Sequence, residues 1–81
     1  MMTKKQVIQA LVEEGWEQYM DKDDYRYWRL SGSNRYVDIE SIYIDIYVYA
    51  NEEKWGTYLT IKEMELFTNL AIILAQEAEE E

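Results

Sequence analysis

The side chains of this protein that could do chemistry are mostly carboxylates. Seventeen Asp and Glu residues stand against eight Lys and Arg residues, and the chain contains neither histidine nor cysteine. The commonest general base, the commonest metal ligand and every thiolate are therefore missing. Ser31, Ser33 and Ser41 have no histidine to activate them, and a chain this acidic supplies pairs of carboxylates by chance. We predict that the protein is not an enzyme and uses no cofactor.

One acidic segment, from Asp21 to Asp24 (DKDD), has the density of acids found in calcium-binding loops. An EF-hand loop beginning at Asp21 needs an acid at its fifth position, glycine at its sixth and glutamate at its twelfth. Those positions hold Tyr25, Arg26 and Gly32. The spacing therefore predicts a solvated acidic loop and no metal site.

A first amphipathic helix is expected close to the start of the chain. Thr3 and Gln6 form a capping-box pattern, and apolar residues follow at helical spacing. Gly15 suits the position just after a helix, with Trp16 placed to fold back on it. The helix is therefore predicted from Lys4 to Glu14.

A second helix is expected after Thr60 and Glu63, which repeat the capping-box pattern. Its apolar face is predicted to comprise Met64, Phe67, Leu70, Ala71, Leu74 and Ala78, widened by Leu66 and Ile73. Residues 77–81 are acidic and lie at the negative end of the helix dipole, so we expect this tail to fray.

The strands are expected between these helices. Aromatic and β-branched residues predict a hairpin of Tyr25–Leu30 and Arg35–Glu40 around a turn at 31–34, and Trp16 can begin a short strand before it. From Ile42 to Ala50 apolar and polar residues alternate strictly, but the apolar set moves from odd to even positions. A bulge or a turn near Glu40 and Ser41 would resolve this shift, and we favour a turn. A turn at 51–56 and a strand at Thr57–Ile61 complete the prediction.

These elements predict an α+β fold, an antiparallel sheet of three to four strands with the N- and C-terminal helices packed on one face. At 81 residues the chain has room for one domain, residues 1–81, of order α-β-β-β-(β)-α. No apolar run is long enough to cross a bilayer, and no signal peptide is recognisable. We expect a soluble cytoplasmic protein.

The face of the sheet away from the helices is the first candidate binding surface. If the aliphatic residues of the alternating strand point inward, the residues that point outward are Tyr43, Asp45, Tyr47 and Tyr49. Tyr25, Tyr27 and Tyr36 are candidates to join them. Tyrosine is enriched at the energetically important positions of interfaces. The alternatives are a solvated face stabilised by tyrosine pairs, or a face covered by another segment.

The second candidate surface is acidic, and it consists of Glu13, Glu14, Glu17, Asp21, Asp23 and Asp24. The net charge of −9 repels nucleic acid and anionic membranes and favours a basic protein partner. Carboxylates and tyrosines together can occupy a protein groove built for phosphates and bases.

In size, charge and aromatic content the chain resembles small acidic inhibitors made by bacteriophages, such as anti-CRISPR and anti-restriction proteins. It shares no motif with them, so no functional residue is carried over from that resemblance. The predicted function is a protein-binding domain, in its most concrete form a nucleic-acid mimic that blocks a basic surface. The alternative is a structural or accessory protein that self-associates, for example as a homodimer, through the tyrosine-rich face. Salt should weaken the first kind of binding and leave the second unchanged.

Overall fold

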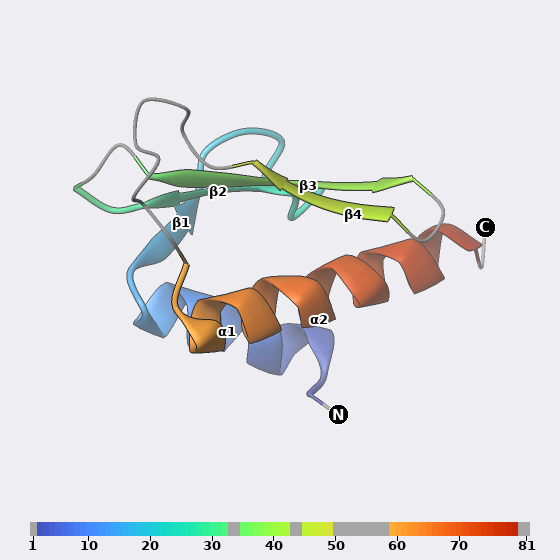
Figure 1. Ribbon diagram of the computed structural model, residues 1–81, viewed down its shortest axis with the longest axis horizontal. Coiled ribbons are helices and arrows are strands. Elements are labelled where there is room, and N and C mark those ends of the chain that lie inside the picture. The colour runs from blue at the N-terminus through green and yellow to red at the C-terminus, as the bar shows by residue number, and fades with distance from the viewer. Residues whose placement is uncertain (1, 33–34, 43–44, 50–58, 80–81) are drawn as a thin grey trace.

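The computed structural model describes residues 2–32, 35–42, 45–49 and 59–79, and for 40–42 and 45–49 it describes the backbone. The elements are α1 (Lys4–Glu13), β1 (Trp16–Gln18), β2 (Tyr27–Leu30), β3 (Tyr36–Ile42), β4 (Asp45–Tyr49) and α2 (Ile61–Glu79). The strands form one antiparallel sheet in the order β1-β2-β3-β4, and both helices lie on one face of it (Figure 1). The predicted α+β class and the placement of both helices are confirmed.

Both helices begin with the capping boxes that the sequence predicts. The backbone N–H of Gln6 donates to the Thr3 hydroxyl, and the N–H of Thr3 donates to the Gln6 side chain. Thr60 and Glu63 exchange the same two bonds at 2.8 and 3.1 Å. The first helix ends at Glu13, one residue earlier than expected, because Gly15 reverses the chain with a φ of 97° that favours glycine.

The core lies between the sheet and the two helices. Its largest fully buried side chains are Trp16, Trp28, Phe67, Leu11, Ile39, Leu70, Val7 and Val37. The Phe67 ring meets the Trp16 ring edge-on, with the ring centroids 4.9 Å apart, and its centroid lies 6.3 Å from that of Trp28. Met64, which we expected on the buried face of α2, is 54% exposed, because that face is centred on Glu63, Phe67, Leu70 and Leu74.

One carboxylate lies inside this core. Glu63 is only 6% exposed and accepts hydrogen bonds from the Trp16 indole N–H at 2.7 Å and from the Thr60 backbone N–H at 2.8 Å. A guanidinium nitrogen of Arg35 lies 3.8 Å from it. Burial raises the pKa of Glu63, but the bonds from Thr60 and Trp16 and the charge of Arg35 lower it more. Its pKa therefore lies below the ordinary value of 4.5.

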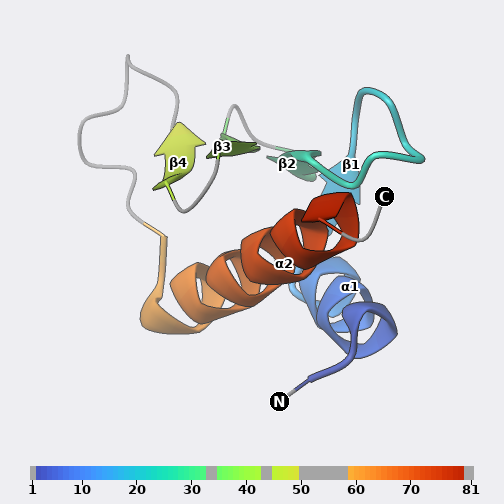
Figure 2. The same cartoon turned by 90° about the vertical axis from the view of Figure 1, so that its right-hand side faces the viewer.

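The two helices run antiparallel beneath the sheet and are joined at both ends (Figure 2). Lys62 and Glu14 form an ion pair of 2.5 Å at one end, and Lys4 and Glu77 form one of 3.0 Å at the other. Helix α2 continues to Glu79, so 77–79 are helical in this structure, and the fraying expected of the tail stays a prediction. The contact with Lys4 offsets the unfavourable acidic C-terminus, and residues 80–81 lie outside the described residues.

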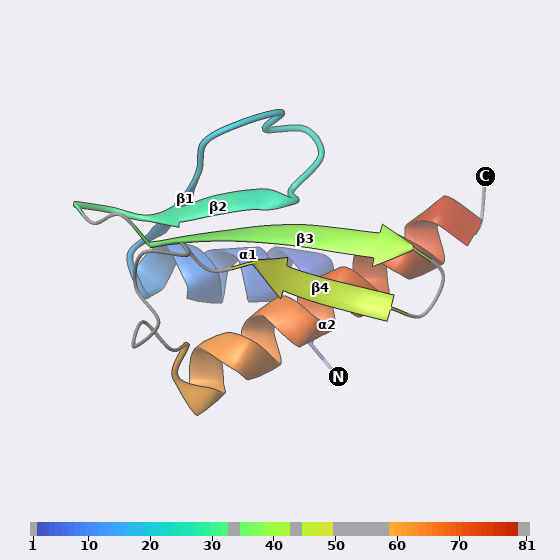
Figure 3. The same ribbon diagram turned by 45° about the horizontal axis from the view of Figure 1, so that its top comes forward.

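The turn expected near Glu40 and Ser41 is wrong, because β3 runs without a break to Ile42. β3 and β4 lie side by side (Figure 3). Ile42 pairs with Asp45, Ser41 with Ile46 and Ile39 with Val48. β3 and β4 therefore pair along their length up to Ile42 and Asp45, and 43–44 lie outside the described residues. In this register the odd positions of β3 stand opposite the even positions of β4, which explains the change of parity in the apolar pattern.

The remaining strand predictions have mixed outcomes. The short strand at Trp16 is confirmed as β1, and β2 begins at Tyr27, two residues later than expected. Tyr25 is excluded from β2 by its φ of 58°. The strand predicted at Thr57–Ile61 is wrong in its described part, because 59–60 belong to no strand and Ile61 opens α2. Residues 50–58, including the predicted turn, lie outside the described residues.

Candidate interaction surface

Neither helix covers the second face of the sheet (Figure 1). The strand register and the burial pattern place a row of polar and aromatic side chains on that face. Along β1, β2 and β3 these residues alternate with the buried Trp16, Trp28 and Val37. We call this surface the tyrosine face, and its described residues are Glu17, Tyr19, Tyr27, Arg29, Tyr36 and Asp38. The register places Glu17 opposite Arg29, Arg29 opposite Tyr36, and Tyr27 opposite Asp38.

Tyr19 is the centre of the tyrosine face. Its ring meets the rings of Tyr27 and Tyr36 at steep angles, with centroid distances of 6.0 and 6.4 Å. Its hydroxyl donates to the Asp38 carboxylate at 2.5 Å, across β2. The Arg29 guanidinium lies over its ring, 5.9 Å from the centroid. The three tyrosines, one cation and one carboxylate are therefore connected before any partner arrives, which lowers the entropy that binding costs.

The environment of Tyr19 makes its ionisation unfavourable. Partial burial, the hydrogen bond to Asp38 and the negative charge of Asp38 raise the pKa of Tyr19 well above its ordinary value of 10.0. Because the folded-state pKa is raised, this arrangement stabilises the fold below pH 10 and its contribution is lost as the pH rises through the raised value.

We expect the substitution Asp38→Asn to lower the pKa of Tyr19, because the neutral amide accepts a weaker hydrogen bond and removes the nearby negative charge. Titration of the phenolate absorbance should show one tyrosine ionising last in the wild type and earlier in the variant. Asp23→Asn, a change in the exposed loop after β1, is the matched control and should leave the curve unchanged. Identical titration curves for Asp38→Asn and the wild type would contradict the described contact.

The tyrosines predicted from the alternating strand fall partly inside the described residues. Tyr49 pairs with Asp38 and Tyr47 with Glu40, while Asp45 pairs with Ile42. The register thus continues the row of the tyrosine face from Tyr27 through Asp38 to Tyr49. Tyr43 lies outside the described residues. The contact of these residues with a partner stays a prediction.

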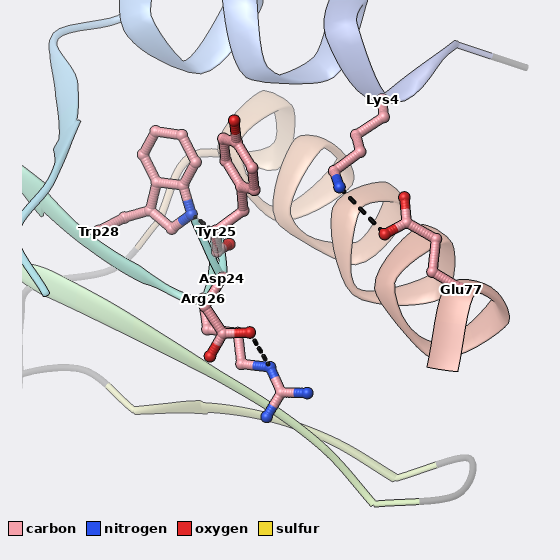
Figure 4. A network of polar contacts seen from close by, with 6 residues as sticks. All are labelled: Lys4, Asp24, Tyr25, Arg26, Trp28 and Glu77. Atoms are coloured by element: carbon pink, nitrogen blue, oxygen red, sulfur yellow. Dashed lines mark hydrogen bonds and ion pairs between the residues drawn. The ribbon is translucent and has the colours of Figure 1, made fainter. Parts of the chain in front are cut away.

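Tyr25 lies elsewhere, in the loop between β1 and β2 (Figure 4). Its backbone carbonyl accepts from the Trp28 indole N–H at 2.9 Å, and Lys4 lies over its ring at 4.7 Å. The same loop contains the Asp24–Arg26 ion pair, with a separation of 3.4 Å. Tyr25 therefore joins the loop to α1 and is not part of the tyrosine face, although the sequence left it as a candidate.

The acidic residues that are close in sequence do not form one patch. Glu13 and Glu14 lie at the C-terminal end of α1. Asp23 and Asp24 share a cleft with Lys4 at the N-terminal end of that helix. Because α1 has 10 residues, the two groups stand roughly 15 Å apart.

Of the other two acids, Glu17 lies apart from both groups, whereas Asp21 lies in the loop with Asp23 and Asp24. Glu17 belongs to the tyrosine face, where it pairs with Arg29 at 3.4 Å. Asp21 is exposed in the loop, and its carbonyl accepts the N–H of Asp24 at 2.8 Å. The acidic contact residues predicted from the sequence are thus spread over three places on the surface.

Most basic side chains of the described part are neutralised within the molecule. The basic residues in ion pairs are Lys4, Arg26, Arg29, Arg35 and Lys62. Glu13, Asp21, Asp23 and Glu65 have no ion-pair partner among the described residues and are exposed. The negative charge that remains is therefore distributed over the surface.

The described residues contain no group of three or more acids that could hold a metal ion. Within the same part of the chain, no helix is long and apolar enough to span a membrane. Comparison with protein-family models, with curated proteins and with solved structures finds no match to this chain. A functional proposal must therefore rest on the side chains themselves.

Sequence reasoning missed Tyr19, Arg29 and Asp38 as members of the candidate surface. One signal was available: if Trp16 points into the core, alternation along β1 places Glu17 and Tyr19 on the opposite face. The pairing of Tyr19 with Asp38 has no such signal, because it depends on how three strands are aligned.

Proposed function

We propose that this protein is a non-catalytic protein-binding domain that uses its tyrosine face to cover a basic surface on another protein. In its most concrete form it is an inhibitor of the anti-CRISPR or anti-restriction type, and the surface it covers is one that binds nucleic acid. Carboxylates take the place of phosphates beside Lys and Arg, and tyrosine rings take the place of bases.

The observation that carries this proposal is the connected set of tyrosines and carboxylates on the face of the sheet opposite the two helices. Tyr19, Tyr27 and Tyr36 provide stiff contact area, and Glu17 and Asp38 provide negative charge beside it. Tyrosine loses little side-chain entropy on binding and supplies both an apolar ring and a hydroxyl. These are the properties of a surface that binds a protein.

The charge of the whole molecule supports a basic partner. The net charge is −9, and most described cations are already paired with acids of the same chain. The resulting field attracts a positive surface and accelerates encounter with it, an effect that falls with ionic strength.

The test begins with capture of partners by the immobilised protein from bacterial lysate at low salt, with elution by DNA and then by high salt. The captured partner is then measured against purified variants. We expect Tyr36→Ala to weaken binding ~10-fold or more, because truncating an interface tyrosine at an energetically central position costs ~2 kcal/mol. Tyr25→Ala, which removes a ring outside the tyrosine face, is the matched control and should retain wild-type affinity if its circular dichroism is unchanged.

A second comparison separates the tyrosine face from the acidic loop. Asp23 and Asp24 are reversed to Lys, while Asp21 is changed to Asn because its φ of 35° suits asparagine better than lysine. If the loop acts only through the long-range field, this variant slows association and leaves dissociation nearly unchanged.

Two outcomes contradict the proposal. Elution of only further copies of this chain, with binding that does not depend on salt, would favour self-association through the tyrosine face. Equal losses for Tyr36→Ala and Tyr25→Ala would mean that binding does not use the tyrosine face.

A further inference from the structure

Basic side chains in this protein are repeatedly held by an aromatic ring and a carboxylate together. Each of three cations lies over a ring of Tyr or Trp and also forms an ion pair. The three sets are Lys4–Tyr25–Glu77, Arg29–Tyr19–Glu17 and Arg35–Trp16–Glu63. In that order the cations lie 4.7, 5.9 and 5.9 Å from the ring centroids and 3.0, 3.4 and 3.8 Å from the carboxylates.

The tyrosine face contains a fourth set of this kind that has no cation. Tyr27 stands opposite Asp38 in the register, and Tyr36 lies two residues before Asp38 on β3, on the same face; Tyr19 contacts all three. All of them are partly exposed. No basic side chain of residues 2–32, 35–39 or 59–79 forms a described ion pair with Asp38 or lies over the rings of Tyr27 and Tyr36.

The geometry of Asp38 leaves it able to take a second partner. Its Oδ1 accepts a hydrogen bond from the Tyr19 hydroxyl at 2.5 Å, which fixes the orientation of the carboxylate. Its Oδ2 has no hydrogen-bond donor among the residues whose side chains are described. A carboxylate held in this way meets an incoming cation without first losing its own freedom.

We propose that the set formed by Tyr27, Tyr36 and Asp38 receives an arginine side chain of the partner protein. This inference rests on the proposed function and names the group that the tyrosine face recognises. The guanidinium stacks on a tyrosine ring and donates to Asp38, as Arg29 does with Tyr19 and Glu17 beside it.

Arginine suits this position better than lysine does. Its planar guanidinium is weakly hydrated, stacks on aromatic rings and presents several fixed donors to one carboxylate. A lysine ammonium is strongly hydrated and offers a single point of charge. Proteins that bind nucleic acid carry exposed arginines of this kind, which links the arginine position to the proposed inhibition.

The test uses the intact protein and three short peptides with capped ends and no other charged residue. They differ only at one central residue, which is arginine, lysine or citrulline, the neutral isostere of arginine. Binding is followed by the amide chemical shifts of the protein. We expect the arginine peptide to move the signals of Tyr27, Tyr36 and Asp38 and to bind at least ~5-fold more tightly than the citrulline peptide. This factor is what a cation–π contact and one exposed ion pair contribute together. The lysine peptide should fall between them.

Asp38→Asn is the first variant, and it should reduce the preference for arginine over citrulline, because only the cation–π contact with the tyrosine ring then remains. Asp23→Asn is its matched control and should retain the preference. If Asp38→Asn alters the fold, Tyr36→Leu provides a second measurement, in which the arginine preference should fall while the core is untouched.

The inference is overturned if the two peptides bind equally to the wild type, or if the arginine peptide shifts mainly the signals of Asp21–Asp24. This failure is distinguishable from failure of the proposed function. A partner whose binding is lost in Tyr36→Ala but unchanged in Asp38→Asn would leave the tyrosine face as the binding surface and remove only the arginine position.

Discussion

Replacing Phe67 with alanine is expected to lower the free energy of unfolding by about 3–5 kcal/mol, the usual cost of removing a buried phenylalanine. Phe67 is fully buried and contacts both Trp16 and Trp28, so its removal leaves a cavity between two large rings that cannot close it. A chain of this length has a small margin of stability, and the melting temperature should fall by roughly 15–30 °C.

The control for this prediction lies one turn away on the same helix. Met64 is 54% exposed, and Met64→Ala should change the free energy of unfolding by less than ~1 kcal/mol. Urea denaturation followed by tryptophan fluorescence measures both variants. Equal losses of stability for Phe67→Ala and Met64→Ala would mean that the buried face of α2 is not the one that contains Phe67.

Replacing Glu63 with alanine is expected to cost about 3 kcal/mol of stability although it removes a buried charge. The substitution leaves the buried Trp16 indole N–H without its acceptor, at a cost of ~1–3 kcal/mol, and it also removes the capping bond from the Thr60 backbone N–H. It also removes the partner of Arg35, which lies 3.8 Å away. Glu65→Ala, at an exposed position of the same helix, should change stability by less than ~0.5 kcal/mol.

The stabilisation by Glu63 should depend on pH in one direction. Because its folded-state pKa lies below the ordinary 4.5, the charged form stabilises the fold above that pH and the contribution is lost as the pH falls through the lowered value. The stability difference between wild type and Glu63→Gln should therefore shrink on acidification below pH 4.5. A difference that stays constant down to complete acid unfolding would contradict the lowered pKa. The contributions of the other carboxylates to the pH dependence are the same in both proteins, so they cancel in the difference between the two free energies of unfolding.

The sequence predicts the parts of the fold that depend on neighbouring residues. The capping boxes at Thr3 and Thr60 each need two residues three positions apart, and the turn at Gly15 needs one residue that tolerates positive φ. Such signals are complete within a few residues, so both helices begin where they are expected. The amphipathic patterns then decide which face of the sheet the helices cover.

The position of the β3–β4 turn could not be predicted because the apolar pattern permits more than one reversal. A change from odd to even positions is satisfied by a bulge, by a turn near Glu40 and Ser41, or by a first strand that continues past Ser41 before it pairs with the next strand. Only the pairing of whole strands decides between these, and that pairing is a long-range property. The same limitation hid the bond between Trp16 and Glu63, which are 47 residues apart.

The candidate surface was predictable in kind and less so in its members. Tyr27 and Tyr36, which the sequence left as candidates, lie on the face opposite the helices, whereas the side chains of the alternating strand from which that face was predicted lie outside the described residues. The acidic residues were misleading, because closeness in sequence from Glu13 to Asp24 becomes separation by the length of α1. When a helix is followed by a strand and a loop, residues that are close in sequence can lie at opposite ends of a small protein.

The arrangement of the strands has a consequence for the kinetics of folding. Each strand pairs with the next one in the chain, so every strand pairing closes a short loop. The contact between Lys4 and Glu77, in contrast, joins residues 73 positions apart. Because the entropy lost on closing a loop grows with its length, we expect the hairpins to be formed in the folding transition state and the two helices to dock on each other after it. Substitutions in β2 and β3 should then slow folding, and substitutions at the helix–helix contacts should mainly accelerate unfolding.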